Sequence, residues 1–96
     1  MSNGKVGSIE KTMTIVNKLG LHARAATQLV QLANQFDAKI VLKKEDKEAD
    51  ANSVLGLMML ESHQGEQVTV VVDGDDAPAA MAAIEQLIAG KFNEKE

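Results

Sequence analysis

The sequence predicts an α+β domain of two layers, in which helices cover one face of a mainly antiparallel sheet. Segments with alternating apolar residues and segments with apolar residues at helical spacing follow one another in the order β-α-β-β-α-β-α. The first and last helical segments carry one-sided apolar stripes, which must be buried against another element. A chain of 96 residues with 45% hydrophobic residues suits one small core and therefore one domain.

The first strand and first helix lie on either side of a tight corner. Residues 9–16 alternate imperfectly and predict a strand with one buried face. Residues 1–8 before them are polar and rich in glycine, so we expect a flexible extension. Residues 17–20 have the composition of a turn. The helix predicted for residues 23–34 has its apolar stripe at Ala26, Leu29, Val30 and Ala33.

The remaining strands differ in length and polarity. Residues 39–44 predict a strand with Ile40 and Leu42 inward, and 45–47 form a charged hairpin tip. Residues 48–51 are short and polar, as expected of a protected edge strand. Residues 67–73 are rich in valine on both faces, which predicts a position inside the sheet.

Two further helices complete the pattern. Asn52 is a suitable N-cap for a helix over residues 53–60, and Asp76 for a last helix that ends at Gly90. We expect residues 93–96 to fray, which leaves a single domain over residues 9–92.

Composition excludes several classes of function. A net charge of −4, with no tryptophan or tyrosine, argues against a nucleic-acid partner and predicts an aliphatic core. The absence of cysteine excludes disulfides and thiolate metal sites. No apolar run is long enough for a membrane span, and no hydrophobic signal region precedes the first strand, so we expect a cytoplasmic protein.

His22 is the strongest candidate for a chemical role. It lies at the predicted start of a helix, where free amides and the helix dipole favour anions. A neutral imidazole there is a nucleophile, and Arg24 adds a cationic fork for phosphate oxygens. With the amides of Ala23, Arg24 and Ala25, this arrangement suits phosphoryl transfer. The other histidine, His63, has neither a nearby arginine nor a helix start, and neither histidine belongs to a metal-binding motif.

The helix over residues 53–60 is apolar almost all the way round, although a helix of about two turns in a small domain is seldom covered on every side. We therefore expect part of it to be an exposed docking surface for partner proteins rather than core alone. From this helix, Val54, Leu55 and Met58 are assigned to the docking surface. Leu21 and Thr27, on either side of the start of the first helix, are assigned to the same surface.

The segment Leu19–Ala26 resembles the active-site loop of HPr, the phosphocarrier of the bacterial phosphotransferase system. The segment Glu48–Leu60 resembles the second signature of that family, and its residues are most similar to those of the nitrogen-related branch. The resemblance covers residues 9–92 and implies an open-faced sandwich of four strands with three helices on one face.

The resemblance also implies a mechanism. The Nδ1 atom of His22 would accept a phosphoryl group from enzyme I, which takes it from phosphoenolpyruvate. The group would then pass to a histidine of an EIIA-type protein, with Arg24 stabilising it. The protein would be a monomeric carrier within a relay and not a free-standing enzyme, with no cofactor except the transient phosphoryl group.

Positions 25, 52 and 54 depart from the usual family pattern. Alanine at position 25 replaces a proline that would rigidify the first helical turn. Ser53 matches the serine modified by HPr kinase/phosphorylase in some members, but its neighbours Asn52 and Val54 are not those of regulated members.

Three alternatives remain at this stage. The first is an HPr of the sugar-uptake branch. The second is a regulatory binding module that uses only the Leu55–Met58 surface, which the pairing of His22 with Arg24 argues against. The third is a small phosphatase of the acylphosphatase type, although the chain lacks that family's glycine-rich arginine loop.

Overall fold

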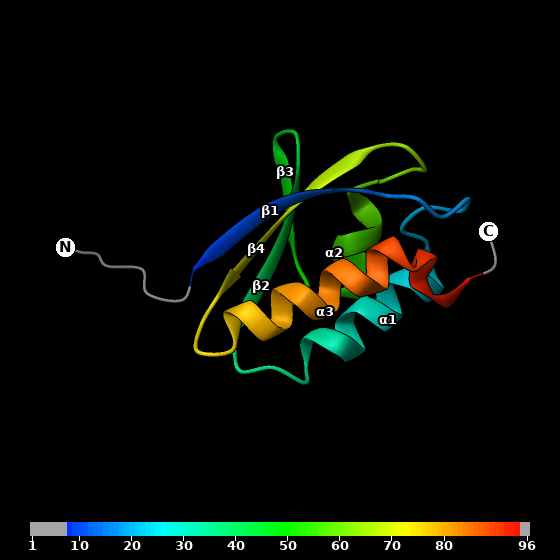
Figure 1. Cartoon of the computed structure of the whole chain (residues 1–96). Coiled ribbons are helices and arrows are strands. Elements are labelled where there is room, and N and C mark those ends of the chain that lie inside the picture. The colour runs from blue at the N-terminus through cyan, green and yellow to red at the C-terminus, as the bar shows by residue number, and fades with distance from the viewer. Residues whose placement is uncertain (1–7, 95–96) are drawn as a thin grey trace.

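The computed structural model describes residues 8–94, and within them a four-stranded sheet carries three α-helices on one face (Figure 1). The elements are β1 (Ile9–Thr14), α1 (Ala23–Ala33), β2 (Lys39–Lys44), β3 (Lys47–Asp50), α2 (Val54–Met59), β4 (Gln67–Asp73) and α3 (Ala77–Ala89), followed by the short 3₁₀ turn η1 (Lys91–Asn93). This order and architecture confirm the predicted α+β sandwich. Within residues 8–94, no helix combines the length and the apolar character needed to cross a bilayer.

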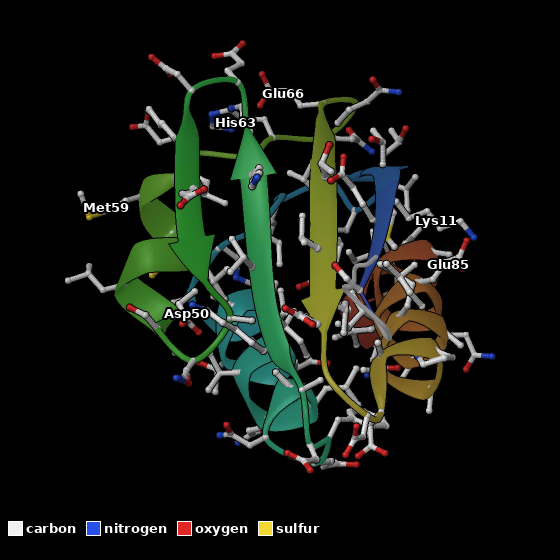
Figure 2. All side chains as sticks on the ribbon, turned by 90° about the vertical axis from the view of Figure 1, so that its left-hand side faces the viewer. Lys11, Asp50, Met59, His63, Glu66 and Glu85 are labelled. Atoms are coloured by element: carbon white, nitrogen blue, oxygen red, sulfur yellow. The ribbon has the colours of Figure 1, made fainter. Side chains whose placement is uncertain are left out.

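The sheet has the order β1-β4-β2-β3, and every pair is antiparallel. The two interior strands turn alternate side chains toward the helices: Val68, Val70 and Val72 from β4, and Ile40 and Leu42 from β2, are all buried. Figure 2 looks directly onto the opposite face, which no helix of residues 8–94 covers. The predicted interior position of β4 and edge position of β3 are therefore confirmed.

Several element boundaries differ by one or two residues from the sequence predictions. β1 ends at Thr14 and α1 at Ala33, each slightly earlier than expected. The N-cap of α2 is Ser53 and not Asn52, because the Ser53 hydroxyl accepts a hydrogen bond from the Gly56 amide at 3.0 Å. Asp76 precedes α3 as predicted, but its carboxylate accepts from the amide of Asp37, at 2.7 Å, instead of capping the helix.

The C-terminal segment departs most from expectation. Lys91, Phe92 and Asn93 all have positive φ values (61°, 55° and 64°), which turn the chain back from α3 toward α1. Phe92 is completely buried and is the one aromatic residue in the core of residues 8–94, which is otherwise aliphatic as predicted. The prediction of fraying was wrong for Asn93 and Glu94, which both form hydrogen bonds to distant residues. Residues 1–7 and 95–96 lie outside the described part of the chain.

Candidate functional site

The corner between β1 and α1 is held by buried polar contacts. Asn17 is fully buried and its Nδ2 donates to the Gly20 carbonyl at 2.8 Å. Gly20 has φ +68°, and a Cβ there would lie 2.3 Å from the Ser62 carbonyl oxygen. That same oxygen accepts from the Leu21 amide at 2.9 Å. The path of the chain into α1 is thus fixed against the loop that follows α2.

That loop, residues 60–66, is held in turn by Lys44. The Lys44 ammonium donates to the carbonyls of Leu60 (3.2 Å) and Glu61 (2.7 Å) and to Oε1 of Glu66 (2.9 Å). Glu66 also accepts from the His63 amide at 2.8 Å. This backbone hydrogen bond, followed by the one from Lys44, holds the pKa of the Glu66 carboxyl below its ordinary value. Glu66 and His63 lie at the same end of the sheet in Figure 2.

His22 is the N-cap of α1. Its backbone is extended (φ −80°, ψ −179°), and its carbonyl accepts the first helical hydrogen bond, from Ala26 at 2.8 Å. Its Nδ1 accepts from the Arg24 amide at 3.3 Å. The sequence predicted the position of His22 at the helix start, which the structure confirms, but not its capping role.

The opposite nitrogen of the ring contacts the C-terminal segment. His22 Nε2 lies 2.5 Å from Glu94 Oε2, and the other carboxylate oxygen of Glu94 accepts from Asn17 Nδ2 at 3.1 Å. Because Nδ1 accepts a hydrogen bond, the neutral ring must carry its proton on Nε2, and this proton is donated to Glu94.

Glu94 is ionised in this arrangement. Its side chain is only 15% exposed, and this burial alone would raise the pKa of its carboxyl. The hydrogen bonds from His22 and Asn17 are the main contacts that outweigh burial and lower that pKa below its ordinary value.

The first turn of α1 supplies further donors for an anion. Ala23, Arg24 and Ala25 are its first three residues, whose amides have no intrahelical acceptor. The Ala25 side chain is buried, whereas Ala23 and Arg24 are exposed beside His22. The structure therefore places His22, Arg24 and the first-turn amides, which the sequence assigned to one site, together at the start of α1.

The predicted docking surface is only partly formed by the residues assigned to it. Leu55 and Met58 are exposed, at 68% and 38%, and Val54 is half-buried. Thr27 is exposed, although its hydroxyl donates to the Ala23 carbonyl. Leu21 is 4% exposed and belongs to the core, so its side chain cannot contact a partner, and that assignment was wrong.

Two exposed apolar residues were missed by the sequence analysis. Leu19 is 67% and Met59 is 65% exposed. Leu19 lies in the turn before His22, and Met59 points outward from α2 in Figure 2. Ser53 is exposed as a helix cap, and its regulation stays a prediction. Residues 8–94 contain no group of three or more His, Cys, Asp or Glu side chains that could hold a metal ion.

Two residues of the site itself, Asn17 and Glu94, were also not foreseen. The signal that could have indicated Glu94 was Phe92, an aromatic residue that follows a helix-ending glycine in a chain with only two phenylalanines. A large apolar side chain after a helix tends to bury itself, and burial of Phe92 directs the next residues toward the domain.

Comparison with known proteins agrees with this geometry. Residues 9–90 match the protein family described as the phosphotransferase system HPr component phosphorylation site. The chain belongs to the HPr family. It is 52% identical to the phosphocarrier protein NPr of Shewanella violacea, over 90% of this chain and 94% of that protein. It is 43% identical to the phosphocarrier protein HPr of Cupriavidus necator, over 92% and 99% of the two chains.

The solved structures of the family have the same fold. The crystal structure of HPr-C-His from Thermoanaerobacter tengcongensis superposes with a TM-score of 0.87, at 41% identity, over 92% of this chain and 99% of that one. The protein is therefore an HPr-family phosphocarrier of the phosphotransferase system. Glu94 lies beyond the residues matched to the family.

Proposed function

We propose that Nδ1 of His22 accepts a phosphoryl group from phosphorylated enzyme I and passes it to a histidine of an EIIA-type protein, in the regulatory nitrogen branch of the system. The observation that carries this proposal is the position of His22 as the N-cap of α1, with Nδ1 turned toward the Arg24 amide. A group bound to Nδ1 would replace that weak 3.3 Å contact and meet the first-turn amides directly.

The electrostatics suit a carrier that must also release its cargo. The amides and the exposed Arg24 guanidinium stabilise phosphoryl oxygens at a surface site, where water screens the attraction. Moderate stabilisation keeps the transfer reversible, which a relay requires.

Support for the nitrogen branch comes from the 52% identity to NPr of Shewanella violacea. The HPr of Cupriavidus necator, at 43%, favours the sugar-uptake branch as the second candidate. A shared partner surface around Leu19, Leu55 and Met58 would serve either branch.

A phosphotransfer assay separates these candidates. The protein is incubated with phosphoenolpyruvate and either a nitrogen-type or a sugar-type enzyme I, beside His22→Ala and the matched control His63→Ala. We expect an acid-labile, alkali-stable phosphoryl group on wild type and His63→Ala only, and faster transfer from the nitrogen-type enzyme. Label on a folded His22→Ala protein would contradict the site, and faster transfer from the sugar-type enzyme would contradict the branch.

A further inference from the structure

We propose that Glu94 is a positioning residue that keeps a proton on Nε2 of His22 throughout the phosphoryl cycle. This inference rests on the proposed role of His22 as the acceptor. It starts from the two hydrogen bonds of the His22 ring: the backbone amide of Arg24 donates to Nδ1, and the Glu94 carboxylate accepts from Nε2. Glu94 therefore contacts the nitrogen that does not react and leaves the reacting nitrogen open.

The orientation of the carboxylate is fixed from behind. Its second oxygen accepts from Nδ2 of Asn17, a fully buried side chain that also donates to the Gly20 carbonyl. A single buried amide thus connects the carboxylate to the turn that carries His22. Partners that hold a carboxylate in this way set the tautomer and the orientation of the histidine it contacts.

The segment that carries Glu94 is anchored independently. Phe92 is buried in the core, and its carbonyl accepts from Gln28 Nε2 at 2.9 Å. Asn93 Nδ2 donates to Oε1 of the same Gln28, also at 2.9 Å. The nitrogen and the oxygen of the Gln28 side-chain amide therefore both bind the C-terminal segment. Gln28 belongs to α1, the helix that His22 caps.

The backbone of this segment is strained, which indicates that its contacts determine its path. Three consecutive non-glycine residues, 91–93, have left-handed φ values. Such dihedrals are unfavourable for residues with a Cβ atom and persist only where the surroundings compensate. The compensation is the burial of Phe92 and the contacts of Asn93 and Glu94, the last of which lie at His22.

The bonding changes show what the Nε2 proton does. In acceptance, the Nδ1 lone pair forms the N–P bond, and the bond from phosphorus to the donor breaks with its electron pair left on the donor. The ring then carries a positive charge with Nε2–H intact, and the Glu94 carboxylate balances that charge. In release, a lone pair of the acceptor histidine forms a new bond to phosphorus while the Nδ1–P bond breaks, its electron pair returns to Nδ1, and the ring becomes neutral imidazole with the same Nε2–H. No proton is gained or lost at either step.

Loss of that proton would make release difficult. A phosphorylated ring without a proton on Nε2 would have to leave phosphorus as an imidazolate anion, a far poorer leaving group than neutral imidazole. A carboxylate that accepts a hydrogen bond from Nε2 favours the ring form with its proton on Nε2 in both states of the carrier.

The test compares Glu94→Gln, which removes the charge but keeps the size, with two controls. Glu85→Gln makes the same change in an exposed ion pair with Lys11, which lies at the edge of the sheet opposite to α2 (Figure 2). Asn93→Ala loosens the anchor on Gln28 but keeps the carboxylate. The ring tautomer of His22 is read by ¹⁵N NMR in the unphosphorylated proteins. The rate of back-transfer from each phosphorylated protein to enzyme I is measured with pyruvate as the final acceptor.

We expect Glu94→Gln to lose the preference for the Nε2–H tautomer and to slow back-transfer about tenfold, the lower end of losses seen when the partner that orients a histidine is removed. Glu85→Gln should match wild type. An unchanged tautomer or an unchanged rate in Glu94→Gln would overturn the proposal, as would an equal loss of rate in Asn93→Ala with a normal tautomer. A wild-type protein that takes up no phosphoryl group would overturn the proposed function instead, while the tautomer measurement would still test Glu94.

Discussion

The His22 side chain has two structural roles, as the cap of α1 and as the hydrogen-bond partner of Glu94, and one proposed chemical role. Capping alone would be satisfied by Ser, Thr, Asp or Asn, which are the usual residues at this position. Histidine is an uncommon cap, and its Nδ1 makes only a long contact with the Arg24 amide. The shorter contact is to Glu94, on the other side of the ring. The ring is thus held mainly through Nε2, the nitrogen opposite the proposed phosphoryl acceptor.

Replacement of Arg24 by alanine tests the cationic contribution. The substitution keeps the amide that donates to Nδ1 and removes only the guanidinium. We expect phosphoryl transfer to slow on the order of tenfold, less than the 10²–10³ typical of a desolvated donor, because Arg24 is exposed. Most of the loss should fall on kcat, and the KM for enzyme I should change little. The control is Lys43→Ala, an exposed cation on β2, and an equal loss there would show a general charge effect.

The lowered pKa of Glu94 predicts a pH dependence of stability. A carboxyl whose pKa is lowered by folding stabilises the folded state above its ordinary value of 4.5, and this contribution is lost as the pH falls through the lowered value. The difference in melting temperature between wild type and Glu94→Gln should therefore be constant near neutral pH and shrink below about pH 4.5. Calorimetry from pH 7 to pH 3 measures it. The pKa of Glu66 is also lowered, but its effect is the same in both proteins and cancels in this difference. A difference in melting temperature that stayed constant down to pH 3 would contradict the His22–Glu94 interaction.

At the scale of elements, α2 separates core from surface within six residues. Leu57 is buried while Leu55, Met58 and Met59 are exposed. A short helix that presents so much apolar surface is more consistent with docking than with packing. The helix packs against α1, so its exposed side chains and His22 belong to neighbouring elements.

A charge on α2 should therefore weaken docking without weakening the fold. We expect Leu55→Glu to raise the KM for enzyme I about tenfold, the loss typical of one important interface residue. The matched control is Ala82→Glu, which places the same carboxylate at an exposed position of α3. Transfer kinetics with thermal melts of both variants provide the measurement. An unchanged KM for Leu55→Glu, or an equal rise for Ala82→Glu, would remove α2 from the interface.

Sequence patterns predicted the elements well because each pattern reflects a local cause. Alternating valines identified β4, and helical spacing identified α1 and α3. The N-cap of α2 was misplaced by one residue because Asn52 and Ser53 are both good caps, and only the hydrogen bond to Gly56 distinguishes them. The exposure of Leu19 and Met59 depends on which neighbours cover each helix and turn, which local spacing does not contain.

At the scale of the whole molecule, the site is a meeting point of three distant segments. Residues 17–22 contact the loop after α2 through Leu21 and Ser62, and they contact the C-terminal segment through Glu94. The pair His22–Glu94 spans 72 positions of sequence and depends on left-handed dihedrals that Lys91 and Phe92 do not favour. His22 and Arg24 could be predicted because they are adjacent in sequence, whereas Glu94 required the complete fold.

Phe92 connects the stability of the whole domain to the site, and its replacement tests that connection. We expect Phe92→Ala to lower the free energy of unfolding by about 3 kcal/mol, because it empties a fully buried aromatic position. Domains of this kind are stabilised by only about 5–15 kcal/mol, so the loss should be large in urea unfolding. The control is Phe36→Ala, a half-buried phenylalanine after α1, where a smaller loss is expected. Because Phe92 also seats Glu94, the variant should lose the Nε2–H preference of His22 even where it remains folded. A cost below 1 kcal/mol with a normal tautomer would show that the C-terminal segment is held by its hydrogen bonds and not by the core.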